Sequence, residues 1–215
     1  MKKKIVFLIT AIAFLSPSNS YVQAQNSINL PTPDMQGGKP LMQVLKMRET
    51  NREFSQKELP LQVISDLLWA AYGVNRPETK GRTAPSAMNV QEIDIYVASP
   101  SGLYLYDPFK NYLKLIAPKD IREATGNQPF VKDAPLNLIF VADLSRAQKL
   151  GANKETDMAL DCGFISQNVY LYCASSGLST VARGWFDEKK LSHAMGLNSN
   201  QKIILTQTVG YPKQK

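Results

Sequence analysis

The chain has 215 residues, 44% of them hydrophobic, which is enough for one domain with a sizeable core. Its formal net charge is +7, but the basic residues are scattered and include no arginine-rich run, a pattern that argues against a nucleic-acid partner. One histidine and two cysteines provide almost no material for a zinc site.

Residues 1–24 have the pattern of a secretory signal peptide. Three lysines at positions 2–4 precede an apolar run over residues 5–15, and small side chains at Val22 and Ala24 suit signal peptidase. The run of about 11 residues is too short to cross a bilayer as a helix. Cleavage removes the three lysines and lowers the formal charge from +7 to +4. We expect an exported protein that begins near Gln25, with no membrane insertion after processing.

The two cysteines, Cys162 and Cys173, lie in one predicted helix. A rise of about 1.5 Å per residue separates them by roughly 16 Å, beyond the reach of a disulfide. We expect both to be buried as small hydrophobic side chains. An exported protein without disulfides is typical of a bacterial periplasm rather than of a small disulfide-stabilised secreted module.

The first half of the mature chain predicts an arm, two helices and a loop. Residues 25–39 contain two prolines and two glycines and predict an extended N-terminal arm, followed by one domain over residues 40–215. Apolar spacing from Leu41 predicts a short helix; if it continues, Arg48 and Arg52 share one helical face with Thr50 between them. A strong helix is predicted to begin at Pro60 and end at Gly73, and a polar loop to cover residues 75–83.

Several strands follow. Ile93, Ile95 and Val97 alternate with Glu92, Asp94 and Tyr96, which predicts a half-buried strand. Leucines on either side of the Asp107-Pro108 turn predict a hairpin, and a brief helix is predicted over residues 119–124. Residues 136–142 are apolar throughout, as in a strand covered on both faces.

The last third predicts two helices and a strand. Residues 155–176 form the longest predicted helix, whose small residues, including Gly163, would let another helix or a flat ring approach closely. Asp187 caps a helix that ends at Gly196, where His193 suits the helix dipole better than a catalytic role. With a final strand over residues 202–212, the fold class is α+β, a central mixed or antiparallel sheet wrapped by helices.

The sequence contains no nucleophile of a familiar kind. It has no Gly-x-Ser-x-Gly elbow, no glycine-rich phosphate loop ending in Lys-Ser/Thr and no His-Glu-x-x-His pair. Such a protein either binds a ligand or takes its chemistry from a cofactor. Two arginines with a threonine between them, at residues 48–52, fit either a solvated helix end or a bound phosphate.

Three separated motifs follow one another along the chain. The first is Arg48-Glu-Thr-Asn-Arg52 with Phe54, and the second is Pro85-Ser86-Ala-Met-Asn89 with Gln91. The third runs from Gln167-Asn168 through Gly177-Leu178 to Gly210-Tyr211-Pro212. In this order and spacing the motifs resemble the FMN-dependent nitroreductase family, and the likeness covers residues 40–212. The stretch Gly-Leu-Tyr-Leu-Tyr-Asp-Pro at 102–108 is similar to the branch that contains thiazoline- and oxazoline-forming peptide oxidases.

The resemblance implies an intertwined homodimer with FMN between the subunits, and hydride transfer between flavin N5 and a small planar or unsaturated substrate. Two arginines would hold the phosphate, a threonine would lie near the ribityl chain, and one turn would face the flavin of the partner subunit. A glutamine would bond the pyrimidine edge, and backbone N–H groups would face N5 and O4. The implied cofactor residues are Arg48, Thr50, Arg52, Pro85, Ser86, Ala87, Asn89, Gln128, Gly184, Trp185 and Lys213.

Two departures from the family pattern leave alternatives open. Trp185 stands where relatives have Gly-Phe, and it fits either a cover for the flavin ring or a core aromatic. Relatives draw electrons from NADH or NADPH, which we expect to be scarce outside the inner membrane. Either another donor serves, or the flavin works as an oxidant with oxygen or a carrier as acceptor. The alternatives to an enzyme are a non-catalytic exported flavin or small-ligand binding protein and a cofactor-free interaction protein.

Overall fold

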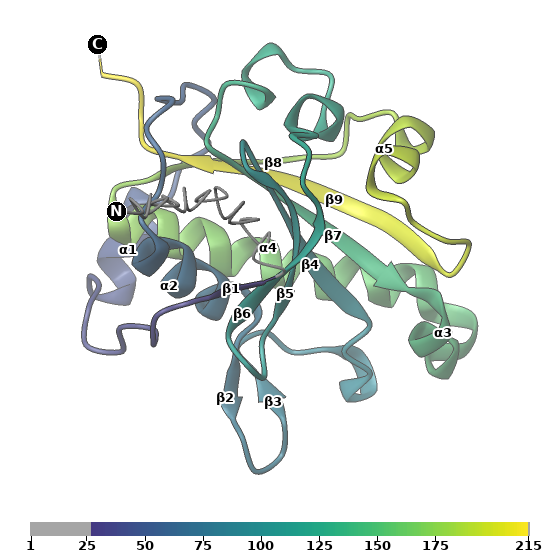
Figure 1. Ribbon diagram of the computed structural model, residues 1–215. Coiled ribbons are helices and arrows are strands. Elements are labelled where there is room, and N and C mark those ends of the chain that lie inside the picture. Colours follow the sequence, from purple (N-terminus) through teal and green to yellow (C-terminus); the bar gives the residue numbers. More distant parts are fainter. Residues whose placement is uncertain (1–26, 215) are drawn as a thin grey trace, which may run out of the picture.

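The computed structural model describes residues 27–214 (Figure 1). The predicted signal peptide lies outside these residues. The largest element is a seven-stranded sheet with strand order β1-β6-β5-β4-β7-β9-β8, and every neighbouring pair in it is antiparallel. Of the two predicted sheet types, the antiparallel one is therefore present. Its strands are β1 (Ser27–Asn29), β4 (Ile93–Ser99), β5 (Gly102–Asp107), β6 (Tyr112–Ala117), β7 (Leu136–Asp143), β8 (Ser179–Arg183) and β9 (Gln201–Gly210).

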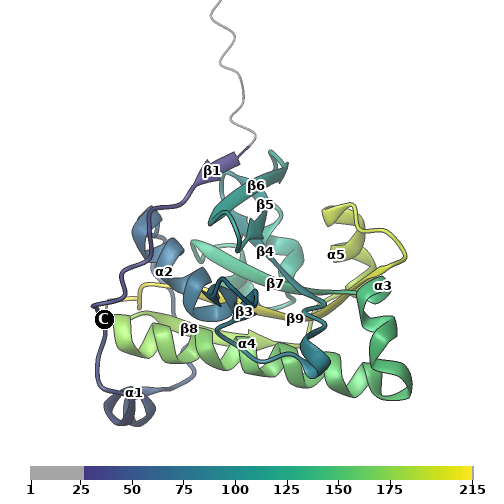
Figure 2. The same ribbon diagram turned by 90° about the horizontal axis from the view of Figure 1, so that it is seen from below.

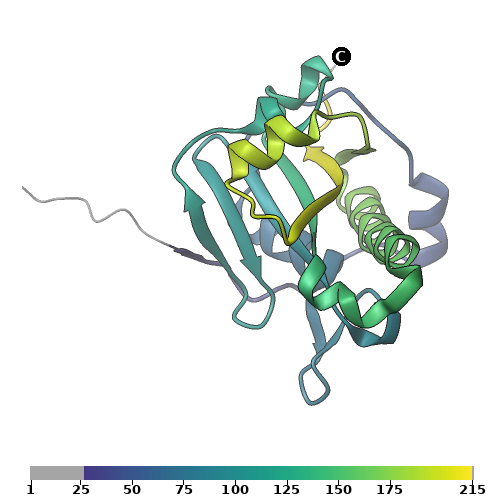
Figure 3. The same ribbon diagram turned by 90° about the vertical axis from the view of Figure 1, so that its right-hand side faces the viewer.

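Helices cover both faces of this sheet. On one face, α2 and α4 pack together over the larger hydrophobic core; on the other, α5 and a 3-10 helix at Arg122–Thr125 cover a smaller one. Figure 3 shows α4 and α5 on opposite sides of the yellow strand β9. The helices are α1 (Leu41–Met47), α2 (Leu61–Tyr72), α3 (Leu144–Ala147), α4 (Lys154–Ser176) and α5 (Glu188–Met195).

The predicted helices α2, α4 and α5 and the strands β4 to β7 are confirmed. Pro60 precedes α2, the Asp187 side chain accepts the Lys190 N–H at the start of α5, and Gly196 follows α5 in the left-handed conformation. These boundaries were predictable because each depends on one capping or helix-ending residue. Both cysteines are free and buried in α4, as predicted.

Other predictions were wrong or incomplete. β4 is not half-buried, because it lies in the middle of the sheet with cores on both faces, and its Tyr96 hydroxyl accepts a bond from Gln201 Nε2 at 3.0 Å. The predicted arm contains β1, which pairs with β6. The predicted polar loop contains a small hairpin, β2 (Val74–Arg76) and β3 (Gly81–Arg82), that extends from the body in Figure 1. The predicted helix over residues 119–124 is the 3-10 helix.

α4 is the element that links the functional segments described below. It runs along one side of the molecule, with α1 beside its C-terminal half (Figure 2). Its inner face is buried, whereas Leu160 and Phe164 on its outer face are 53% and 46% exposed. No helix within residues 27–214 has the length and apolar character needed to cross a membrane.

Candidate functional site

The segment with the two arginines begins where α1 ends. The helix ends at Met47, and Arg48 already has a non-helical backbone with φ −58° and ψ 116°. The Asn51 side chain accepts a backbone N–H two residues later at 2.8 Å, a local bond that competes with helix formation. The helix therefore does not continue, and Arg48 and Arg52 do not share a helical face.

Tyr170 on α4 positions this segment, although no sequence pattern marks it. Its hydroxyl accepts the Ala182 N–H from β8 at 3.0 Å and lies 3.2 Å from Thr50 Oγ1. The Arg48 guanidinium lies over its ring, 5.5 Å from the centroid. Arg48 is half-buried, Thr50 and Arg52 are exposed, and no ion pair in the described part of the chain includes either arginine. Both guanidinium groups can therefore bind an anionic ligand.

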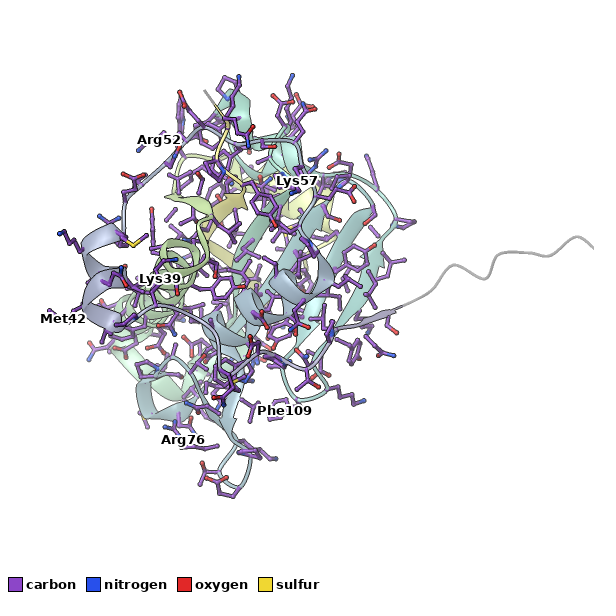
Figure 4. The ribbon with its side chains drawn as sticks, turned by 90° about the vertical axis from the view of Figure 1, so that its left-hand side faces the viewer. Lys39, Met42, Arg52, Lys57, Arg76 and Phe109 are labelled. Atoms are coloured by element: carbon purple, nitrogen blue, oxygen red, sulfur yellow. The ribbon has the colours of Figure 1, made fainter. Side chains whose placement is uncertain are left out.

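The C-terminal end of the chain runs beside the arginine segment. Phe54 forms a β-bridge with Pro212, and the Lys213 N–H donates to the Glu53 carbonyl oxygen at 3.3 Å. Lys57 and Lys213 both line a cavity of about 680 Å³ at this place. Figure 4 shows Lys57 at the same end of the molecule as Arg52. These adjoining segments thus hold four cationic residues, Arg48, Arg52, Lys57 and Lys213, and sequence reasoning identified all of them except Lys57.

A second predicted segment, the turn from Pro85 to Asn89, has an unusual backbone. Met88, Asn89 and Gln91 have φ of 50°, 54° and 55°, a left-handed conformation that is costly for residues other than glycine. Pro85 and Asn89 are exposed, whereas Ser86 and Ala87 are half-buried. The predicted turn is therefore present, and it is held in a strained form of the kind that clusters at functional sites.

Gln128, Gly184 and Trp185 form the third predicted group, and the structure brings them together. The Asn127 N–H donates to the Trp185 carbonyl oxygen at 3.2 Å, which ties the loop before Gln128 to the end of β8. The Gln128 Oε1 atom is buried and has no hydrogen-bond partner in the structure. Trp185 is 66% exposed. Of the two alternatives for this residue, a cover for the flavin ring or a core aromatic, the second is therefore wrong.

Arg183 lies behind this group as a buried cation that sequence reasoning missed. Its guanidinium donates to the Thr125 carbonyl oxygen at 2.7 Å and to Asn137 Oδ1 at 2.9 Å, and no carboxylate pairs with it among the described residues. Burial lowers its pKa to about 10, so it stays charged at neutral pH. Gly126 lies against it, because a Cβ there would overlap Arg183 Nη1.

The first and third groups are linked within the chain, and the turn lies at a distance from them. β8 connects the arginine segment to Gly184, since the Asn51 N–H donates to the Thr180 carbonyl oxygen at 3.1 Å. The turn is elsewhere: it contacts Asp161, nine residues before Tyr170 and about 14 Å away along the axis of α4. Within residues 27–214 no cluster of three or more His, Cys, Asp and Glu side chains could hold a metal ion.

Comparison with known proteins identifies the family of the chain. Over residues 45–211 the sequence matches the nitroreductase family. The chain belongs to this family. A crystal structure of a nitroreductase from Ralstonia eutropha is 46% identical, with a TM-score of 0.85 over 90% of this chain and 92% of that one. A Methanocaldococcus jannaschii protein named as a nitroreductase is 28% identical over 191 residues, 84% of this chain and 96% of its own.

Two further matches of this nitroreductase family member are more distant. A NADPH-flavin oxidoreductase from Vibrio harveyi is 26% identical over 104 residues, covering 44% of this chain and 43% of the relative. A chain of the Escherichia coli microcin synthetase complex shares 17% identity and a TM-score of 0.68 over 99% of this chain and 79% of its own, which is a likeness of fold alone.

Proposed function

We propose that this nitroreductase family protein is an FMN-dependent oxidoreductase that transfers hydride between flavin N5 and a small planar or unsaturated substrate. The observation that carries the proposal is that Arg48, Arg52 and Lys213 lie on adjoining segments and that none of them is paired with a carboxylate among the described residues. Such a group of cations suits a phosphate dianion, which accepts charge-assisted hydrogen bonds from guanidinium and ammonium groups. The oxidoreductases among the relatives support the same class of activity.

The other end of the site also fits the cofactor. Gln128 Oε1 is buried without a partner, and a buried acceptor of this kind calls for a donor such as the N–H of a flavin pyrimidine edge. FMN, when bound, supplies the hydride chemistry. The role of the chain is to orient the ring with Gln128 and the Gly184–Trp185 backbone, and to place the exposed Trp185 indole where a flat substrate enters.

We also propose that the protein works as a homodimer. The turn at Pro85–Asn89 contacts Asp161, about 14 Å along α4 from Tyr170, and the family resemblance implies that it faces the cofactor of the partner. The exposed face of α4 suits the interface, because Leu160 and Phe164 are large and apolar and nothing lies within 4 Å of a Cβ added at Gly163.

A Leu160→Asp, Phe164→Asp double variant tests this interface. We expect the dimer dissociation constant to rise at least about a hundred-fold, because burying each side chain contributes about 1.5–3 kcal/mol. Sedimentation velocity measures the change. Phe109→Asp, a matched change of an exposed phenylalanine in the turn between β5 and β6, should leave the dimer intact. A wild-type chain that sediments as a monomer with FMN bound would contradict the proposal.

The cellular setting is part of the proposal. We propose that residues 1–24 direct export to a bacterial periplasm, and that the electron donor there is a carrier other than NADH or NADPH. In its favour are the lysine-rich start and short apolar run of residues 1–15. Edman sequencing of the protein recovered from osmotic shock fluid should begin at Gln25. An intact N-terminus in the cytosolic fraction would contradict this expectation.

Absorption spectroscopy tests the central proposal. The purified protein, or protein mixed with FMN, should show the flavin bands near 370 and 450 nm and bleach with dithionite. Reduction by NADH, NADPH, a quinol or a dithiol then identifies the donor class. Colourless protein that takes up no FMN would overturn the proposal. FMN that is bound but reduced by none of these donors would instead favour a non-catalytic flavin-binding protein.

A further inference from the structure

Two buried carboxyl side chains lie directly beneath the turn that we place at the cofactor. Glu92, just before β4, is fully buried, and Asp161 on α4 is 3% exposed. The Ala87 N–H donates to Asp161 Oδ2 at 2.8 Å, and the Ser86 hydroxyl donates to Glu92 Oε2 at 3.4 Å. Each acid therefore holds one residue of the turn, and each comes from a different element of the core.

The turn needs such anchors because its backbone is strained. Three non-glycine residues close together, Met88, Asn89 and Gln91, have positive φ. A conformation of this kind persists only where surrounding contacts impose it. The Gln91 N–H donates to Ser86 Oγ at 2.7 Å. The Ser86 hydroxyl therefore connects Glu92 to the far end of the turn through two hydrogen bonds.

The two acids are adjacent, and burial raises the pKa of both. Two adjacent buried carboxylates repel, so a state with one proton between them is favoured over a state with none. The protonated acid then donates to the other, which leaves oxygen lone pairs for the turn.

Other charged groups surround the pair without neutralising it. Arg82 donates to Gln91 Oε1 at 2.9 Å and to the Tyr72 carbonyl oxygen at 3.1 Å. Arg146 forms ion pairs with Asp94 and Asp143 and reaches only the backbone of Glu92. The titratable and charged groups that face the pair are Tyr72 from α2, Arg82 from β3, Arg146 from α3, and Asp157 and Cys162 from α4.

We propose that Glu92 and Asp161 are positioning residues that share one proton and thereby hold the turn over residues 86–91 in its left-handed form. The inference rests on the proposed function in one respect, that the turn contacts FMN. The folded chain keeps a proton that the unfolded chain releases at the ordinary pKa of a carboxyl group. The shared proton therefore stabilises the turn fully at low pH. This stabilisation is lost as the pH rises through the raised pKa of the pair.

Hydrogen exchange on the flavin-free protein tests the pair without using the cofactor. The protection factors of the Ala87 and Gln91 amides, corrected for intrinsic exchange, should fall at least tenfold between pH 6 and pH 9 in the wild-type chain. In Glu92→Gln they should stay constant, because the amide N–H₂ donates permanently to Asp161. Asp161→Asn keeps the same bonds in the opposite direction and serves if the first variant fails to fold.

FMN affinity provides the second measurement. The wild-type dissociation constant should rise more steeply with pH than that of Glu92→Gln, and the comparison at each pH cancels titration of FMN itself. Identical pH profiles of amide protection in the wild-type chain and both variants would overturn the inference. A protein that binds no FMN would overturn the proposed function alone, because amide protection still reports on the pair.

Discussion

The Arg48→Ala, Arg52→Ala double variant is expected to bind FMN about a hundred-fold more weakly than the wild-type chain. Hydrogen bonds to charged groups contribute about 1.5–3 kcal/mol each. The exposure of Arg52 and the half-exposure of Arg48 place both contributions at the lower end of that range. Together they give about 3 kcal/mol, or roughly two powers of ten in the dissociation constant. Isothermal titration calorimetry measures the loss.

Riboflavin makes this experiment specific for the phosphate. The double variant should lose most of the preference for FMN over riboflavin, because only the phosphate differs between the two ligands. Lys189→Ala, Lys190→Ala removes the same two charges from the exposed side of α5 and should leave both affinities unchanged. An equal loss for FMN and riboflavin would show that the arginines do not bind the phosphate.

Gly126→Ala is expected to lower the free energy of unfolding by about 3 kcal/mol. The added methyl group would overlap Arg183 Nη1 and lie 2.7 Å from Gln128 Oε1, so the guanidinium would have to leave its bonds to Thr125 and Asn137. A buried cation that loses its acceptors carries a desolvation penalty of this order. For a domain of this size the melting temperature should fall by about 6–12 °C.

Gly184→Ala is the matched control for this prediction. It makes the same substitution at the residue that follows β8, an exposed position with no atom within 4 Å of the added Cβ. We expect a change within about 0.5 kcal/mol. Thermal unfolding of flavin-free protein measures both variants. A wild-type melting temperature for Gly126→Ala would mean that Arg183 is not fixed by these contacts.

The parts of the fold that were predictable from sequence depend on local chemistry. α2 and α5 have a proline or an aspartate at the start and a glycine after the end, and the turn at Asp107-Pro108 fixes the β5–β6 hairpin. β8 was missed because its position depends on pairing with β9, a distant part of the chain. β1 was missed for the same reason.

Individual residues of the site were predictable from the sequence, but the way in which they are arranged in space was not. The motif around Arg48 was recognised, whereas the role of Tyr170 follows from where α4 crosses β8, which no local pattern encodes. Glu92 looked like the polar half of a half-buried strand, because alternation alone does not show that a second layer covers the other face. Arg183 was missed because a buried arginine without an acid partner contradicts the usual expectation for charged residues.

The contact between Asn51 and Thr180 has a consequence for the protein without its cofactor. β8 is the last strand of the sheet, and the segment after α1 lies against its outer side. An uncovered edge strand is a template for pairing with another chain. A ligand that binds Arg48 and Arg52 would fix this segment against β8 and keep the edge strand covered. Cofactor binding should therefore protect the protein from aggregation.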